Sequence, residues 1–137
     1  MDNVILLDLD GVMITTKPWK SDFNLADNFA EFNPKAVYKL NQLLKETGYD
    51  IVLSSARRYN YDIDKMNEFF KTRGIEGNII GYLPLVDRNL MHSRYYEILQ
   101  FLFANRCENY LIIDDDKSLN KLHDKSLILT DPMIGLI

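Results

Sequence analysis

The stretch Val4-Ile5-Leu6-Leu7-Asp8-Leu9-Asp10-Gly11-Val12 decides the fold of this chain. Its unbroken apolar run predicts a strand that is buried on both faces of a parallel sheet, because a half-exposed strand would alternate apolar and polar residues. Side chains two positions apart on an extended chain point to the same side, so Asp8 and Asp10 are placed to face one ligand beyond the carboxyl end of this strand. Gly11 offers backbone freedom where the chain turns away from the sheet. The alternative interpretation is an acidic turn that only closes a core strand.

The rest of the sequence predicts strands that alternate with helices. Short apolar runs predict four more strands, at residues 51–53, 78–82, 110–113 and 127–129. Apolar residues at helical spacing predict helices from Pro34 to about Gly48, from about Asp62 to Arg73, and from Ser93 onward. Such alternation implies right-handed βαβ units. We therefore expect an α/β fold of three layers, Rossmann-like, with a central parallel sheet of about five strands.

One domain is expected to span residues 1–137, since 47% of them are hydrophobic and 12% aromatic, which is ample for one core. Residues 13–32 show no sustained periodicity, and we expect them to form an irregular loop over the site at the end of the first strand. Aromatic residues within this stretch, Phe29 and Phe32 among them, suggest that it packs on the domain. The alternative is a surface insertion that packs on nothing.

The composition excludes several classes of protein. The formal net charge is -4, so no whole-molecule basic field would attract nucleic acid or an anionic membrane, although a local patch stays compatible with nucleic-acid ends. Cys107 is the only cysteine, which excludes a disulfide framework and a cysteine-rich zinc site. No apolar run approaches the roughly 20 residues of a membrane span, and the N-terminus lacks the basic start of a signal peptide. We expect a soluble, cytoplasmic protein with no membrane partner.

Polar side chains follow three of the predicted strands, and a basic residue precedes the last of them. They are Asp8 and Asp10, Ser54 and Ser55, the triplet Asp114-Asp115-Asp116, and Arg94 at the head of a helix. In a parallel sheet these strand ends converge at one edge. A buried cluster of acids is costly unless a cation is bound, and hard oxygen ligands favour Mg²⁺. A carboxylate can attack phosphorus to form an aspartyl-phosphate, while cations and hydroxyl donors stabilise the equatorial oxygens. The sequence therefore predicts a magnesium-dependent phosphoryl-transfer site.

Competing motifs fail at specific positions. Neither a GxxxxGK[ST] phosphate loop nor a GxGxxG dinucleotide fingerprint is present. A calcium loop from Asp114 to Lys125 would place Leu119 where glycine is needed and a lysine where the last glutamate is needed. Each group alone also has a structural alternative: the serines as turn residues, the aspartate triplet as the acidic start of a short helix, and Arg94 as a solvated surface residue.

The order of these motifs resembles the haloacid dehalogenase (HAD) superfamily of phosphotransferases. It runs, with h for an apolar residue, as hhhhDxDGV, hhhS, a basic residue on a helix, and hhhhDD, and it covers nearly the whole chain. The resemblance implies that Asp8 is the nucleophile and that Asp10 is the general acid and base for the leaving group. It also implies that Ser54, with Ser55 beside it, binds the phosphate.

The same resemblance implies a metal site and a basic phosphate ligand. Asp114 and Asp115 match the acidic pair that completes the Mg²⁺ site, to which Asp8 and the main-chain carbonyl of Asp10 also contribute. The basic residue of the third motif is usually lysine. Arg94 is the best match here, and Arg88 and Lys117 are weaker candidates.

Within the superfamily the chain looks like the small domains, without a large cap domain, of RNA-repair and polynucleotide kinase/phosphatase proteins. Three groups of residues carry this likeness: Leu53-Ser54-Ser55 with Arg58, Arg94-x-x-Glu97-Ile98, and the tail Leu129-Thr130-Asp131-Pro132-x-x-Gly135-Leu136. The chain departs from these relatives at Arg57, where they often carry tryptophan.

We therefore expect a magnesium-dependent phosphomonoester hydrolase, with the 3′-phosphate ends of nucleic acids as the candidate substrate. A site without a folded cap is open, so it can admit the end of a polymer. Arg57 and Arg58 would then contact phosphates, and Trp19 could stack on a terminal base, with packing in the core as the alternative and more common use of that ring. The alternatives are a phosphatase of nucleotides or sugar phosphates, and a catalytically idle HAD-like binding module.

Overall fold

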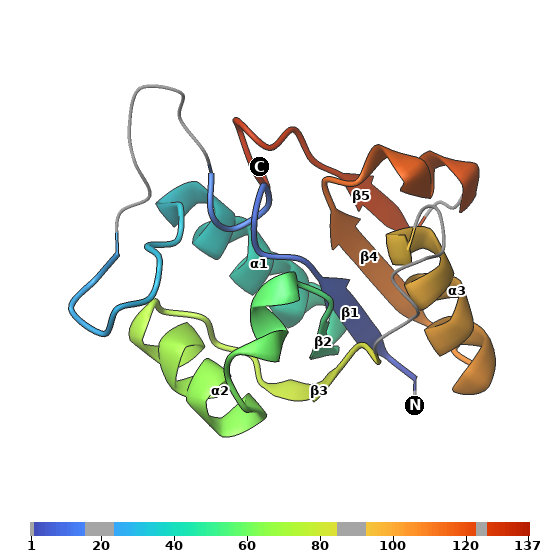
Figure 1. The fold of residues 1–137 in the computed structure, drawn as a ribbon, viewed down its shortest axis with the longest axis horizontal. Coiled ribbons are helices and arrows are strands. Elements are labelled where there is room, and N and C mark those ends of the chain that lie inside the picture. Colours follow the sequence, from blue (N-terminus) through green and yellow to red (C-terminus); the bar gives the residue numbers. More distant parts are fainter. Residues whose placement is uncertain (1, 16–23, 85–92, 123–125) are drawn as a thin grey trace.

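The computed structural model describes residues 2–15, 24–84, 93–122 and 126–137, which form a sheet of five parallel strands (Figure 1). The strands stand in the order β3-β2-β1-β4-β5. Their bounds are Val4–Leu7 for β1, Asp50–Leu53 for β2, Ile79–Tyr82 for β3, Tyr110–Asp114 for β4 and Leu127–Leu129 for β5. This arrangement confirms the predicted α/β class and the predicted sheet of five parallel strands.

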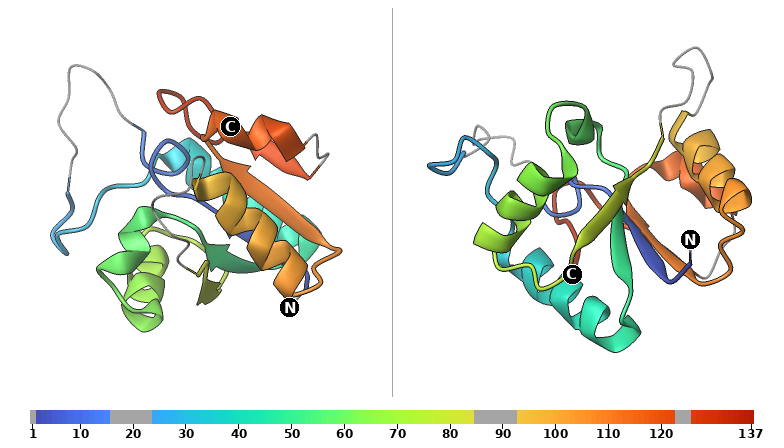
Figure 2. Two further views of the ribbon diagram at one scale, coloured as in Figure 1. Left: turned by 45° about the vertical axis from the view of Figure 1, so that its right-hand side comes forward. Right: turned by 90° about the horizontal axis from the view of Figure 1, so that it is seen from below.

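Helices cover both faces of this sheet (Figure 2). They are α1 (Pro34–Thr47), α2 (Ile63–Thr72) and α3 (Ser93–Ala104), together with two short 3₁₀ helices, η1 (Ala56–Tyr59) and η2 (Lys117–Leu122). The apolar side chains of α1 and α2 pack on one face, and those of α3 and η2 pack on the other. The result is the expected three-layer fold.

Strand β1 lies at the centre of the sheet and is buried on both sides. Ile5 and Leu7 pack with α1 and α2, whereas Val4 and Leu6 pack with α3. None of the four side chains is exposed to solvent. An unbroken apolar run is therefore explained by two buried faces, as predicted.

The residues at the start of α1 cap the helix and connect it to the loop after β1. The side chain of Asn33 accepts a hydrogen bond of 3.0 Å from the Lys35 N–H, and Pro34 occupies the first turn, where its missing N–H is not needed. The Asn33 N–H in turn donates to the carbonyl of Met13 at 2.8 Å. The start of α1 is thus tied to the loop that carries the first acidic motif.

Residues 24–32 are held on α2 by a cluster of aromatic rings and by one arginine. The Phe29 ring is 1% exposed and stacks on Phe69 with the ring centroids 4.3 Å apart. Arg73, at the end of α2, donates to both carboxylate oxygens of Asp27 at 2.7 and 2.9 Å and to the carbonyls of Phe29 and Ala30. The hydrogen bonds from Arg73 lower the pKa of Asp27 to about 2. The expectation that this stretch packs on the domain is confirmed for residues 24–32.

Among the described residues, no helix combines the length and the apolar character that crossing a membrane requires.

Candidate active site

Three neighbouring strands deliver the candidate site residues to one edge of the sheet. Leu7 on β1 is in register with Leu53 on β2 and with Ile113 on β4. The residues that come next, Asp8, Ser54 and Asp114, therefore stand at the same level at this edge of the sheet. This convergence explains how residues 46 and 106 positions from Asp8 in the sequence come together with it.

Asp8, Asp114 and Asp115 form an acidic cluster, which we call the floor of the site. Each offers an oxygen that lies within 4.8 Å of those of the other two. Asp8 is 6% exposed and Asp114 is 1% exposed. One oxygen of Asp114, Oδ2, is buried without a hydrogen-bond partner among the described residues. A buried carboxylate oxygen that accepts no hydrogen bond, beside two further carboxylates, is the donor set that a hard cation takes.

The electrostatics of the floor are unfavourable without a cation. Burial raises the pKa of Asp8 to about 8, and the neighbouring Asp114 adds to this shift. Burial also raises the pKa of Asp114 to about 6. Arg94 opposes both shifts, because its positive charge favours the ionised carboxylates. A second positive charge at this place would keep both groups ionised near neutral pH.

Gly11 makes room for the third carboxylate of the floor. Its φ is +82°, which L side chains rarely adopt, and a Cβ built there would overlap the carboxylate of Asp115. The glycine of the DxDG motif is therefore required by two independent features of the structure, its backbone conformation and the approach of Asp115.

Arg94 is the basic residue that the structure brings to the floor. Its guanidinium lies 3.8 Å from Oδ1 of Asp8 and 3.6 Å from Oδ2 of Asp114, and it also donates to the carbonyl of Ser54. Of the weaker candidates, Lys117 is exposed on η2 and Arg88 lies outside the described residues. Of these three candidates, Arg94 is therefore the one that the structure places against the acidic cluster.

The two serines after β2 have different surroundings. The hydroxyl of Ser54 is buried and has no hydrogen-bond partner among the described residues, so it is available to a ligand oxygen. The hydroxyl of Ser55 accepts a hydrogen bond of 3.2 Å from the Arg57 N–H and caps η1. Of the predicted pair, Ser54 is the residue with an uncommitted hydroxyl.

The predicted substrate contact of Arg58 is wrong, because this side chain is interior. Arg58 is 5% exposed. It donates to the carbonyls of Ser54, Ser55 and Leu83 and forms an ion pair of 3.1 Å with Glu97 on α3. These partners occupy the guanidinium on all sides. Arg58 therefore holds the turn after β2 in place and links it to α3.

Asp10 and Arg57 form a second acidic and basic pair, which we call the rim of the site. Arg57 Nε donates to Oδ2 of Asp10 and Arg57 Nη2 donates to Oδ1, both at 2.9 Å. The side chain of Asp10 is 55% exposed and that of Arg57 is 27% exposed. The carboxylate of Asp10 is not one of the three that form the floor, and the sequence did not predict its pairing with Arg57. Opposite charges at the ends of two strands were the available signal.

Trp19 lies outside the described residues. The tail after β5 is tied to the first motif, since Thr130 Oγ1 donates to the Gly11 carbonyl at 2.8 Å and the Leu136 N–H donates to the Val12 carbonyl at 2.9 Å. A Cβ at Gly135 would lie 2.6 Å from that same Val12 oxygen, so glycine permits this close approach. Asp116 accepts from the Ser118 N–H and begins η2 instead of joining the floor.

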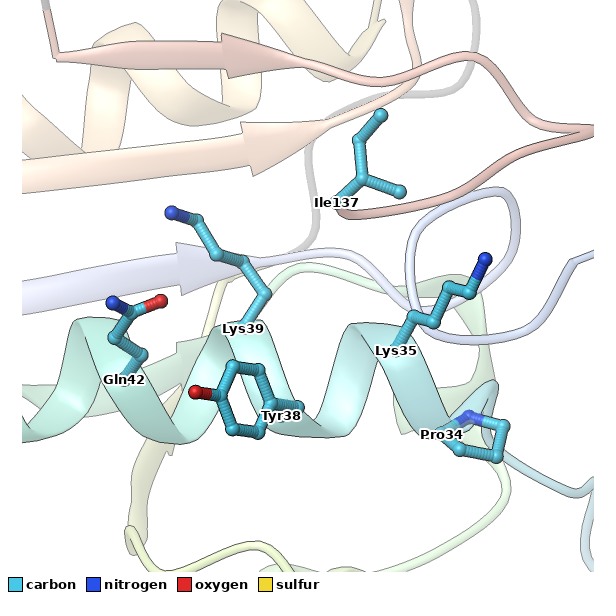
Figure 3. Close-up of a pocket in the computed structure, with 6 residues that line it drawn as sticks. All are labelled: Pro34, Lys35, Tyr38, Lys39, Gln42 and Ile137. Carbon is cyan, nitrogen blue, oxygen red and sulfur yellow. The ribbon is translucent and has the colours of Figure 1, made fainter.

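A pocket of about 520 Å³ lies elsewhere, along α1 and the end of the described chain (Figure 3). Its lining is Pro34, Lys35, Tyr38, Lys39, Gln42 and Ile137. It shares no residue with the floor or the rim. We therefore place the candidate active site at the strand ends and not in this pocket, because the groups that could bind a cation or a phosphate gather at the strand ends.

Comparisons with known proteins identify the family of the chain. No curated protein matches the chain in a sequence comparison. A family model described as the HAD domain in Swiss Army Knife RNA repair proteins matches residues 4–137, a span that includes the floor, the rim, Ser54 and Arg94. HAD domains of this type support a phosphatase-type hydrolase in general, and the buried aspartates offer a place for the metal ion that such domains typically use. With this match over nearly its whole length, the chain belongs to the family of HAD domains found in Swiss Army Knife RNA repair proteins.

Proposed function

We propose that this protein is a Mg²⁺-dependent phosphomonoester hydrolase that works through an aspartyl-phosphate on Asp8. The observation that carries the proposal is the floor of the site. Three carboxylates and the Arg94 guanidinium gather at the ends of β1 and β4, and the Ser54 hydroxyl stands beside them without a partner. The carboxylates can bind a cation, and the guanidinium and the hydroxyl can bind a phosphate next to that cation.

The metal would be held by residues that fit it. Asp8, Asp114 and Asp115 supply carboxylate oxygens, and the Asp10 main-chain carbonyl is the further ligand that the family resemblance implies. The Oδ2 of Asp114, which accepts no hydrogen bond, and the raised pKa values of Asp8 and Asp114 support a cation at this place. Mg²⁺ would neutralise charge on the phosphate and keep these carboxylates ionised.

The residues of the chain then divide the work in two steps. In the first, an Asp8 oxygen forms a bond to phosphorus while the ester bond breaks, and Asp10 gives a proton to the departing oxygen. Arg94 and the Ser54 hydroxyl hold the equatorial phosphate oxygens. In the second step, Asp10 takes a proton from water, which attacks the phosphorus, and the bond to Asp8 breaks to release inorganic phosphate.

The 3′-phosphate end of a nucleic acid is the proposed substrate. The family to which the chain belongs is described as the HAD domain in RNA repair proteins. The rim also supports an open entrance, because the Asp10 side chain is 55% exposed. The end of a polymer can reach such a site without being enclosed, whereas a small metabolite would lose the binding energy that enclosure provides.

A phosphatase screen with and without Mg²⁺ tests the proposal. It would compare a 3′-phosphorylated oligonucleotide, its 5′-phosphorylated counterpart, mononucleotides and sugar phosphates. We expect Mg²⁺-dependent release of phosphate, with the highest kcat/KM for the 3′-phosphorylated oligonucleotide. Equal kcat/KM for sugar phosphates would favour a small-molecule phosphatase. Binding of Mg²⁺ and phosphate without turnover on any substrate would favour an idle binding module.

A further inference from the structure

The Asp10 carboxylate differs from those of Asp8 and Asp114 in its exposure to solvent. It stands on a turn closed by the Gly11 N–H, which donates to the Ile14 carbonyl at 2.8 Å. Its side chain is 55% exposed, so the surrounding protein does not enclose it as it encloses Asp8. An exposed aspartate on a turn would ordinarily exchange between rotamers. A group that must transfer a proton to one particular oxygen gains from being held in one of them.

Arg57 supplies that restraint through a planar fork. Two of its nitrogens, Nε and Nη2, each donate to a different oxygen of Asp10, and both distances are 2.9 Å. Two parallel bonds fix the plane of the carboxylate as well as its position, which a single bond does not. Lysine would keep the positive charge but could not reproduce this geometry.

Arg57 is itself held by contacts of its backbone with Ser55 and of its guanidinium with Phe29. Its backbone N–H is bonded to Ser55 at the start of η1, so the main chain is fixed. Its guanidinium lies over the Phe29 ring, 5.4 Å from the centroid. That ring is buried and stacked on Phe69 of α2. The aromatic cluster that anchors residues 24–32 therefore also backs the arginine of the rim.

We propose that Arg57 is a positioning residue that holds the Asp10 carboxylate in one orientation at the rim of the site, with Phe29 as its support. The proposal rests on the proposed function, in which Asp10 transfers protons. Arg57 acts through Asp10 and does not bind the scissile phosphate. Its loss should therefore matter most where the departing oxygen needs a proton, and little where the leaving group departs unaided.

The test compares two aryl phosphates in the wild-type protein and its variants. p-Nitrophenyl phosphate has a good leaving group and phenyl phosphate has a poor one. We expect Arg57→Gln to lower kcat/KM for phenyl phosphate about tenfold and for p-nitrophenyl phosphate less than about twofold. Arg57→Lys should restore little of this loss. The inhibition constant of inorganic phosphate should stay unchanged, because ground-state phosphate binding does not use Arg57.

A double-mutant cycle adds a readout that a merely structural role would not move. In an Asp10→Asn background, Arg57→Gln should change kcat/KM for phenyl phosphate by less than about twofold, since there is no proton donor left to position. Lys35→Gln is the matched control for the loss of one positive charge: Lys35 is exposed on α1 and outside the site. That variant should match the wild-type protein with both substrates.

Three results would overturn the proposal. Equal losses with both substrates, together with weaker inhibition by phosphate, would make Arg57 a substrate contact. A higher kcat/KM in Arg57→Gln would make the pair a latch that restrains Asp10. An undiminished effect of Arg57→Gln in the Asp10→Asn background would show that it does not act through Asp10.

Failure of the proposed function gives a different result, namely no turnover by the wild-type protein. The pairing of Arg57 with Asp10 is then tested by urea unfolding of the wild-type protein, Arg57→Gln, Asp10→Asn and the double variant. A zero coupling free energy between the two substitutions would reject the pairing itself.

Discussion

The floor and the rim of the site carry the same kinds of charged groups in different surroundings. On the floor, Asp8 and Asp114 are almost fully buried, and Arg94 lies 3.8 and 3.6 Å from their oxygens, which is too far for hydrogen bonds. On the rim, Asp10 is half-exposed and makes two short bonds to Arg57. The floor is thus short of positive charge and suits a cation, whereas the rim is balanced on its own.

Two consecutive arginines repeat this contrast. Arg58 is buried and donates hydrogen bonds to four residues. Arg57 is partly exposed and donates two hydrogen bonds to Asp10. The 3₁₀ turn of η1 directs neighbouring side chains to different sides, so one supports the fold and the other reaches the site. Position relative to solvent, more than residue type, decides what each charged group does.

The largest expected effect comes from changing the floor at its nucleophile. Asp8→Asn should lower kcat by at least about 10³-fold, because an amide cannot form the aspartyl-phosphate. Because burial already disfavours the ionised form of this carboxyl, the neutral amide should leave thermal stability equal to or above that of the wild-type protein. Phosphate release assays and a thermal scan check both points. Asp116→Asn, next to the floor but outside it, is the control; normal turnover by Asp8→Asn would refute the assigned chemistry.

The next effect sharpens the comparison of the two arginines. Arg58→Met should lower the free energy of unfolding by about 3–5 kcal/mol, because Glu97 would be left buried without a partner. Arg57→Met should lower it by less than about 1 kcal/mol, since its pair with Asp10 is partly exposed and screened by solvent. Urea unfolding measures both. Equal losses would mean that the rim pair is as integral to the fold as the buried one.

The sequence was sufficient for the elements and for the floor, because both follow from local patterns. Apolar runs located the strands, helical spacing and the Asn33-Pro34 cap located α1, and the parallel sheet then brought Asp8 next to Asp114. The order of the strands and the two 3₁₀ helices were not predicted, since no periodic pattern specifies them.

The rim was not predictable in the same way. Arg57 and Arg58 are adjacent residues of the same type, and the turn of η1 gives them different surroundings. The clasp between Arg73 and Asp27 also joins residues 46 positions apart, through a loop with no periodicity. Such contacts depend on tertiary packing, which one sequence does not encode as a local signal.

A smaller effect separates the floor from the residue just beyond it. Asp114→Ala should weaken Mg²⁺ binding by about tenfold or more, because Asp114 supplies a buried oxygen that accepts no hydrogen bond. Asp116→Ala should change it by less than about twofold, since that carboxylate begins η2. Titration calorimetry gives both constants. The reverse order would place the metal beyond the strand end, nearer to η2.

The smallest expected effect concerns the protons on the floor. The pKa values of Asp8 and Asp114 are raised to about 8 and about 6, mainly by burial, whereas both groups ionise near pH 4 in the unfolded chain. Between these limits the folded, metal-free protein holds protons that the unfolded chain has released. Its stability should therefore fall as the pH rises from about 4 to about 8, and should change little from these groups above that range.

Mg²⁺ should reverse this trend, because it binds the ionised carboxylates and takes the place of the protons. At about pH 6 its binding must still displace a proton from Asp8, whereas at about pH 8.5 most of that proton is gone. We expect the rise in Tm on adding Mg²⁺ to be larger at the higher pH by about 3 °C. Asp10→Asn should keep this difference, since the rim takes no part in it, and Asp8→Asn should remove most of it. An equal rise at both pH values in the wild-type protein would mean that the floor is already ionised at pH 6, and the contrast in charge between floor and rim would not hold.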